Sequence, residues 1–597
     1  MSENATELPK PEQLSEAVTK VAAETNRMMS EYMEHQKSLA AANPFDPMGI
    51  GAAFVDFTAQ LMTDPDRLMK VQMDMMTGYF DLWQNASRRW MGMDPIKPTV
   101  EPARDDRRFR ADDWSTSPFF DFIKQSYLVA ADAVQGLVAD VEGLDQKTRH
   151  KVEFYTKQMV DAMAPTNFAT TNPEVLRATV ETGGQNLING MQNFLRDFDQ
   201  ERGMLRTRMT DESAFELGKN VGASEGKVIF RNKLFELLQY SPSTAQVYKR
   251  PLLIVPPWIN KFYILDLQPK NSMIKWLVDQ GHTVFVMGWV NPDESLSDCG
   301  FEDYMKDGVL TAIDEVLAET GEKDLNIVGY CIGGTLLGIT LAYLTKKRQQ
   351  KKVNAATFFT ALLDFSEPGD LGVFIDEKQL NELDSKMSEK GYLDGTEMAT
   401  TFNLLRSNDL IWSFMINNYL LGKDPFPFDL LYWNSDSTRM PRELHSTYLR
   451  RMYHDNALVQ AGEFVVDGVG IDLSTIKTPA YFISTREDHI APWVSTYLGA
   501  RNLSSEVRFV LGKSGHIAGI VNPPVANKYG YFTNGDIHGV EPEQWLESAE
   551  AHEGSWWTDW HQWMTSFDAT MVPARKPGAG GHKVLGDAPG TYVKVRI

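Results

Sequence analysis

The pattern of apolar and polar positions changes character partway along the 597 residues. Up to about residue 220, apolar residues recur at helical spacing, and methionine is frequent among them between residues 68 and 83. From Gly222-Ala223-Ser224-Glu225-Gly226 onward, short apolar runs alternate with longer helical segments. Such alternation is typical of a mostly parallel sheet covered by helices. We therefore expect an all-α amino-terminal domain over residues 1–220 and an α/β domain over residues 221–597.

Six short apolar runs in the second region are predicted strands. They have the length and the β-branched or aromatic content of buried strands. The runs are residues 252–255, 284–287, 325–328, 357–363, 479–485 and 507–511. Between the fourth and fifth runs, from about residue 366 to residue 467, the alternation lapses into helix-like, aromatic-rich sequence. An insertion of this size between strands is predicted to cover the active site as a helical cap.

A pentapeptide after the third predicted strand carries the clearest chemical signal. Gly329-Tyr330-Cys331-Ile332-Gly333 separates strand 325–328 from an apolar helical run over residues 334–344. It matches the nucleophile elbow of the α/β-hydrolases, with cysteine in place of serine. Gly329 and Gly333 suit that turn, because side chains there would collide with neighbouring backbone. The alternative is a glycine-rich turn that contains a buried structural cysteine.

Two later strands supply the partners that such a nucleophile needs. Asp488 follows the strand at residues 479–485, and His516 follows the strand at residues 507–511. The chain order of nucleophile, acid and histidine is that of an elbow enzyme. Cys331, Asp488 and His516 are therefore the predicted catalytic triad.

One alternative base and two oxyanion donors accompany this prediction. His489 is the rival base, but neighbouring side chains in an extended loop point apart, so it is poorly placed to bond Asp488. The backbone N–H of Ile332, first in the elbow helix, is the expected first oxyanion donor. A second donor is expected from the loop after the strand at residues 252–255, around Trp258-Ile259-Asn260.

Composition excludes several classes of protein. A net charge of −21 opposes nucleic acid binding, because phosphate groups must be met by clustered lysine and arginine. Cys299 and Cys331 lack the spacing of a zinc site or a disulfide framework, and no other metal motif or phosphate loop occurs. No apolar run reaches the length of a membrane span, and the polar residues 2–7 do not resemble a signal peptide. We expect a cytoplasmic protein without a metal, in which Cys299 is a bystander.

Several further segments resemble one family. They are Asp106-Arg107-Arg108-Phe109 with Trp114, residues 256–267, residues 329–334, Tyr432-Trp433-Asn434, residues 488–493, residues 515–519 and residues 588–594. From about residue 106 to residue 597 the chain resembles a class I polyhydroxyalkanoate synthase of the α/β-hydrolase superfamily. Residues 1–100 match only in general character. The resemblance implies an α/β-hydrolase catalytic domain with a helical cap insertion, preceded by an all-α domain.

The resemblance also implies an activity. Enzymes of this family polymerise (R)-3-hydroxyacyl-CoA, here expected to be the short-chain 3-hydroxybutyryl-CoA, into polyhydroxyalkanoate with release of CoA. A thiol suits this chemistry, because attack by Cys331 exchanges one thioester for another and keeps the acyl carbon activated. CoA is part of the substrate, so no cofactor is expected. Ile259, Asn260, Asp266 and Trp433 are candidate pocket residues, although Asp266 and Trp433 are equally well explained as buried structural residues.

The expected partners are the growing polyester chain and the granule surface, and a homodimer associated with cytoplasmic storage granules is implied. The methionine-rich stripe is either the core of the helical domain or an adaptable face for a partner or the granule. Two other functions stay open. A thioesterase or depolymerase uses the same triad with water as acceptor, and a non-enzymatic granule-coating protein has no need of the triad.

Overall fold

Two compact units make up the chain in this computed structural model, which describes residues 50–91, 93, 100–103, 106–139, 141–199 and 205–596. Unit 1 comprises Met1–Asp211 and Phe402–Phe426, and unit 2 comprises Glu212–Thr401 and Pro427–Ile597. What the sequence predicts before residue 50 lies outside the described residues. The functional role given to residues 1–220 and the cap at residues 366–467 stay predictions.

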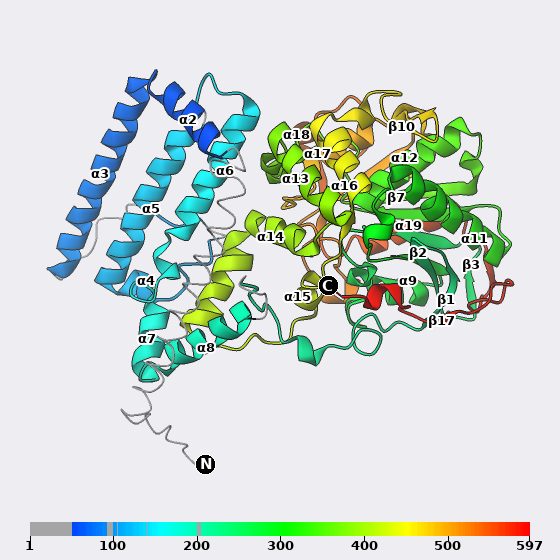
Figure 1. The fold of residues 1–597 in the computed structure, drawn as a ribbon, viewed down its shortest axis with the longest axis horizontal. Helices are drawn as coiled ribbons and strands as arrows, with labels where there is room; N and C mark the ends of the chain where they lie inside the picture. Colours follow the sequence, from blue (N-terminus) through cyan, green and yellow to red (C-terminus); the bar gives the residue numbers. More distant parts are fainter. Residues whose placement is uncertain are drawn as a thin grey trace, which may run out of the picture. The chain divides into compact units, whose positions relative to one another are not determined.

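Helices form unit 1, and their starts follow capping rules. The Asp64 carboxylate accepts a hydrogen bond from the Arg67 N–H at 3.0 Å, and Asp145 and Asn172 cap later helices in the same way. Helix α3 packs against α5, α5 against α6, and α2 against α6 (Figure 1). The helices are α2 (Ile50–Leu61), α3 (Pro65–Trp90), α4 (Asp113–Thr116), α5 (Pro118–Val138), α6 (Gln146–Ala162), α7 (Pro173–Glu181) and α8 (Gln185–Asp199).

The methionine-rich stripe is not the core of this unit. Helix α3 faces α5 through Leu82 and Ala86, which are buried, and it leaves most of the other large apolar side chains between residues 68 and 83 exposed. Those exposed are Leu68, Met69, Met73, Met75, Met76, Tyr79, Phe80 and Trp83. The core interpretation is therefore wrong for α3. A buried cluster forms instead at the α2 and α6 end, around Phe57 and Val152.

The segment Phe402–Phe426 packs on helix α8 within unit 1. It holds the π-helical turns η8 (Asn408–Trp412) and η9 (Met415–Leu420). Asn186 donates to the Leu420 carbonyl at 2.9 Å, and the Tyr419 hydroxyl donates to the Asp197 carboxylate at 2.8 Å. A Cβ at Gly190 would lie 1.8 Å from the Tyr419 carbonyl oxygen, so the two backbones touch. Nothing in the sequence indicated that this part of the insertion joins the helical unit.

A sheet of eleven strands organises unit 2. Its spatial order is β15-β14-β13-β12-β7-β6-β4-β5-β2-β1-β17, and the central strands from β13 to β5 are parallel. The strands are β1 (Gly226–Arg231), β2 (Phe235–Tyr240), β4 (Leu252–Val255), β5 (Val284–Trp289), β6 (Leu325–Tyr330), β7 (Val353–Phe359), β12 (Ala480–Thr485), β13 (Val507–Gly512), β14 (Tyr531–Thr533), β15 (Glu550–His552) and β17 (Gly586–Asp587). All six predicted strands are present, but the fourth covers residues 353–359 rather than residues 357–363.

Helices cover both faces of this sheet, as strand alternation requires. Along β4, Leu253 and Val255 join one buried cluster, whereas Leu252 and Ile254 join the other. Helices α11 (Thr311–Thr320) and α12 (Ile332–Lys346) contribute to the first cluster, and α9 (Met273–Asp279) and α19 (Trp557–Ser566) contribute to the second. The remaining helices of unit 2 are α10 (Phe301–Asp303), α13 (Glu377–Lys390), α15 (Asp429–Asn434), α16 (Arg442–Thr447), α17 (Trp493–Arg501) and α18 (Pro542–Glu547), and α14 (Gly395–Leu405) crosses into unit 1.

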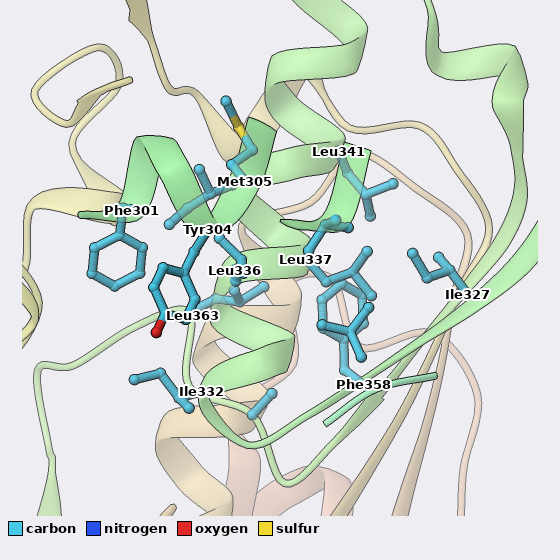
Figure 2. Close-up of a cluster of buried hydrophobic side chains, with 14 of the residues drawn as sticks. Phe301, Tyr304, Met305, Ile327, Ile332, Leu336, Leu337, Leu341, Phe358 and Leu363 are labelled. Carbon is cyan, nitrogen blue, oxygen red and sulfur yellow. The ribbon is translucent and has the colours of Figure 1, made fainter. Parts of the chain in front are cut away.

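Helix α12 is the best-buried helix of the first cluster. Figure 2 shows Ile332, Leu336, Leu337 and Leu341 projecting from it among side chains of neighbouring elements, including Phe358. Every residue from 332 to 344 is buried. Close packing on this scale leaves the start of the helix little freedom, so the residue before it is held in place. That residue is Cys331.

Candidate active site

Cys331 lies at the turn between β6 and α12 with φ 51° and ψ −124°. Few residues other than glycine adopt such a backbone, and it persists only where the surroundings enforce it. The Cys331 N–H donates to the Phe359 carbonyl of β7 at 2.9 Å, which fixes the turn to the next strand. The thiol is partly exposed. A strained, accessible nucleophile is what the elbow motif predicts.

Three glycines make this turn possible. A Cβ at Gly329 would lie 2.5 Å from the Gly334 Cα, and one at Gly333 would lie 2.4 Å from the Val255 carbonyl oxygen. A Cβ at Gly334 would lie 2.4 Å from the Ala361 Cβ. Helix α12 thus crosses both its own strand and the end of β4 at backbone distance. The sequence predicted the need for Gly329 and Gly333, and the structure supplies the contacts that impose it.

Asp488 lies in the loop after β12, and its carboxylate is fully occupied. Oδ1 accepts the backbone N–H groups of Ile490 and Ala491, both at 2.9 Å. Oδ2 accepts the Thr485 hydroxyl at 3.3 Å and lies 2.7 Å from His516 Nδ1. The Asp488 side chain is completely buried. These bonds orient the carboxylate toward His516 across two neighbouring parallel strands.

His516 lies in the loop after β13 and links Asp488 to Cys331. Because Nδ1 donates to the carboxylate, Nε2 is the ring nitrogen left for a second partner, and Cys331 is near enough to the imidazole to raise its pKa. The ring packs over Tyr330, with ring centroids 5.9 Å apart. Burial lowers the pKa of His516, but the Asp488 carboxylate and the Cys331 thiol outweigh burial and raise that pKa to about 10.

The structure therefore places the three predicted triad residues close to one another: His516 is bonded to Asp488 and interacts electrostatically with Cys331. The rival base, His489, follows Asp488 directly, and its carbonyl oxygen approaches Gly369. Both oxygens of Asp488 are committed to other groups, one of them to His516. Cys299 lies apart from these three residues. It is buried in the first core cluster, where burial raises the pKa of its thiol.

Backbone N–H groups beside Cys331 suit an oxyanion. Ile332 is the first residue of α12, so its N–H has no partner within the helix and points out of its positive end. The loop over Trp258-Ile259-Asn260 follows β4, which lies beside β6 with Val255 opposite Gly329. Ile259 and Asn260 are partly exposed there. The predicted donors thus come from the two elements that flank the elbow.

Asp266 and Trp433, the other predicted pocket residues, are bound into the surrounding structure. Asp266 Oδ1 accepts the hydroxyls of Ser224 and Ser272, both at 2.6 Å, and Oδ2 accepts the Ser224 N–H at 3.0 Å. The Trp433 indole N–H donates to the Lys261 carbonyl at 2.7 Å. Both side chains are buried. Their contacts favour the alternative weighed from the sequence, in which each is a structural residue.

Two tyrosines near the thiol were missed from the sequence. Tyr448 and Tyr453 belong to the π-helix η10 (Tyr448–His454) in the predicted cap, and their rings meet edge to face with centroids 5.2 Å apart. Burial raises the pKa of both hydroxyls, and an electrostatic interaction with Cys331 raises both further. Only the aromatic-rich composition of the insertion pointed toward them. Among the described residues, no group of three or more His, Cys, Asp or Glu side chains is arranged to hold a metal ion.

Comparison with known proteins decides the family. Residues 105–277 match the family described as poly-beta-hydroxybutyrate polymerase (PhaC) N-terminus, and residues 250–523 match the alpha/beta hydrolase fold. A poly(3-hydroxyalkanoate) polymerase of Methylorubrum extorquens is 47% identical over 94% of this chain and 95% of its own length. The chain belongs to the poly(3-hydroxyalkanoate) polymerase family.

Other members of this polymerase family are similar over nearly the whole chain. A poly(3-hydroxyalkanoate) polymerase subunit PhaC of Rhizobium meliloti (strain 1021) is 48% identical over 90% of this chain and 87% of its own length. That of Cupriavidus necator is 41% identical over 92% of this chain and 91% of its own length. The predicted family and fold class are confirmed, and the chain is an enzyme of the acyltransferase type. No helix among the described residues combines the length and the apolar character that a bilayer span requires.

Proposed function

We propose that this polymerase uses (R)-3-hydroxyacyl-CoA, with 3-hydroxybutyryl-CoA as the preferred unit, and forms an acyl-cysteine intermediate on Cys331. One observation carries the proposal: a cysteine in a strained elbow, within reach of an imidazole that is bonded to a buried carboxylate at 2.7 Å. In this assignment Cys331 is the nucleophile, His516 the proton carrier and Asp488 the group that orients it. No cofactor takes part in the proposed cycle.

Acylation is the first half of the cycle. The Cys331 sulfur, having given its proton to His516, attacks the thioester carbonyl, and the resulting oxyanion is stabilised by the Ile332 N–H. When the tetrahedral intermediate collapses, the bond to the CoA sulfur breaks and His516 returns its proton to that sulfur. One thioester replaces another, so the acyl group stays activated for the next step.

Transfer to a hydroxyl completes the cycle. His516 takes the proton of a 3-hydroxyl group, whose oxygen attacks the acyl carbon on Cys331 and forms an ester. The carbon–sulfur bond breaks, and the sulfur regains the proton from His516. Water must be kept from the acyl-cysteine, because hydrolysis ends the chain, and the predicted cap at residues 366–467 is suited to that task.

The test follows both products in one reaction. Purified protein receives (R)-3-hydroxybutyryl-CoA, and released CoA, free 3-hydroxybutyrate and insoluble polyester are measured together. The proposal expects CoA release with polyester and little free acid. Equimolar CoA and free acid would assign the same site to a thioesterase, and the absence of an acyl group on Cys331 by mass spectrometry would exclude the proposed intermediate.

The family resemblance supports two further proposals. We infer that the enzyme works as a homodimer and that it acts at the surface of cytoplasmic polyester granules, where its product accumulates. Analytical ultracentrifugation with and without substrate tests the first. Fluorescence microscopy of a tagged protein in cells that store polyester tests the second, with diffuse fluorescence as the contrary result.

A further inference from the structure

Side chains from a distant segment hold the loop that follows β4. The Thr438 hydroxyl lies 2.7 Å from the Trp258 carbonyl oxygen and 2.5 Å from the Ile259 carbonyl oxygen. The Trp433 indole N–H donates to the Lys261 carbonyl oxygen, two residues further along the loop, at 2.7 Å. The carbonyls of residues 258, 259 and 261 therefore all face side chains of the segment at residues 433–438.

A buried ion pair fixes the far end of the same loop. Lys261 Nζ lies 2.5 Å from Asp436 Oδ1, and the two side chains are only 4% and 1% exposed. The Tyr263 hydroxyl donates to Asp436 Oδ2 at 2.9 Å, and Lys261 also donates to the Val595 carbonyl at 2.9 Å. Charged groups that are so fully enclosed and hydrogen-bonded permit little change of geometry.

This bonding determines where the loop amides point. In a trans peptide the C=O and the following N–H point in opposite directions. Because the carbonyls of Trp258 and Ile259 face Thr438, the N–H groups of Ile259 and Asn260 face away from it. The loop begins beside the elbow, since β4 pairs with β6. One of these two amides therefore lies in the loop where the second oxyanion donor is predicted.

We propose that Thr438 is a positioning residue, which orients the amides of Ile259 and Asn260 toward the oxyanion while the Lys261–Asp436 pair anchors the loop. The inference rests on the proposed function, because it concerns the acylation of Cys331. A residue of the predicted cap, in this proposal, helps to set the geometry of the transition state. Thr438 acts through the loop backbone and not through contact with the substrate.

The first experiment replaces the hydroxyl with a methyl group of similar size. Thr438→Val should lower the single-turnover rate of CoA release from (R)-3-hydroxybutyryl-CoA by about 10- to 100-fold with KM near the wild-type value, because misplaced donors act on the transition state. Thr438→Ser, which restores the hydroxyl, should recover most of the rate. Thr340→Val is the matched control: Thr340 is also buried, but its hydroxyl bonds the Leu336 carbonyl within α12.

Alkylation of Cys331 by iodoacetamide separates positioning from general damage. Alkylation needs the thiol and His516 but passes through no oxyanion, so its rate in Thr438→Val should equal that of wild type. An equal loss of alkylation and acylation would overturn the inference, as would acylation by Thr438→Val at the wild-type rate. If Thr438→Val does not fold, Thr438→Ala gives the same comparison. A wild-type protein that is never acylated on Cys331 would instead overturn the proposed function itself.

Discussion

At the scale of single residues, Cys331 combines a strained backbone with a thiol that lies near the His516 imidazole. Cys331→Ala should lower CoA release on the order of 10⁴-fold or more, as loss of a nucleophile does in triad enzymes. Cys331→Ser should acylate far more slowly than wild type, because the hydroxyl is the weaker nucleophile, and it should transfer its acyl group poorly, because an ester lacks the activation of a thioester. CoA release measured with a thiol reagent tests both variants. Near-normal release by Cys331→Ala contradicts the assignment.

His516 gives the site a specific dependence of stability on pH. Although burial lowers the pKa of His516, Asp488 and Cys331 raise it to about 10, above the ordinary value of 6.5. A raised pKa stabilises the folded protein fully below about pH 6.5, and this contribution is lost as the pH rises through 10. Asp488→Asn removes the strongest raising interaction but keeps an oxygen for the Ile490 and Ala491 N–H groups.

Thermal denaturation should therefore show the largest difference between wild type and Asp488→Asn near pH 6, with the difference shrinking toward pH 10. Thr485→Val is a useful comparison, because it removes only the neutral hydroxyl that donates to Asp488. Its effect on the melting temperature should vary little with pH. A difference between wild type and Asp488→Asn that grows from pH 7 to pH 10 would contradict the sign of this effect.

The sequence was sufficient to place residues whose position follows from chain order. Cys331, Asp488 and His516 were predicted because each follows a recognisable strand, and parallel strands bring their ends to one edge of the sheet. Thr438 was not predicted, because its role depends on carbonyls about 180 residues earlier in the chain. A hydroxyl that bonds backbone has no signature in a single sequence. Asp266 stays a predicted pocket residue, because its motif resembles the family, although its side chain bonds Ser224 and Ser272.

At the scale of elements, the elbow depends on how closely α12 approaches β4. A Cβ at Gly333 meets the Val255 carbonyl oxygen at 2.4 Å, whereas one at Gly338 meets the end of the Leu363 side chain at 2.6 Å. The Val255 carbonyl belongs to the backbone and cannot easily move, whereas the Leu363 methyl group at the end of a side chain can shift. Gly333→Ala should therefore destabilise the protein by about 1–3 kcal/mol, and Gly338→Ala should cost much less because alanine also favours the helix.

Differential scanning calorimetry of the two variants decides this comparison. Gly136→Ala in α5 adds a third point, since a Cβ there meets nothing within 4 Å. Its melting temperature should equal or exceed that of wild type. Equal losses for Gly333→Ala and Gly338→Ala would show that the crossing of α12 over β4 is looser than these distances imply.

Element boundaries show what the sequence could not supply. The fourth strand was predicted over residues 357–363 because apolar residues continue there, but β7 ends at Phe359. Thr360 has φ 41°, so the chain turns away from the extended conformation at that point. The helical spacing of apolar residues predicted helix in this region, and α3 confirms it. Which side faces α5 depends on the neighbour as well as on the helix, so the sequence could not decide between the core and the exposed-face interpretations of the methionines.

At the scale of the whole molecule, one insertion belongs to both units. The chain leaves unit 2 after Thr401, contributes Phe402–Phe426 to unit 1 and returns at Pro427. Shortly after this return come Trp433, Asp436 and Thr438, which hold the loop after β4. The part of the chain that fixes the proposed oxyanion loop is thus continuous with a part that packs on α8.

Gly190→Ala tests how firmly that insertion is held in unit 1. The added Cβ would lie 1.8 Å from the Tyr419 carbonyl oxygen, so α8 and η9 must separate at a cost of about 1–3 kcal/mol. Hydrogen–deuterium exchange in peptides from Phe402–Phe426 should then rise about 10- to 100-fold if exchange follows local opening. Exchange across Ile332–Lys346 should stay at the wild-type level, because α12 belongs to the other unit. Unchanged exchange in Phe402–Phe426 would mean that the Gly190 contact does not hold the insertion, and equal increases everywhere would mean that the two units unfold together.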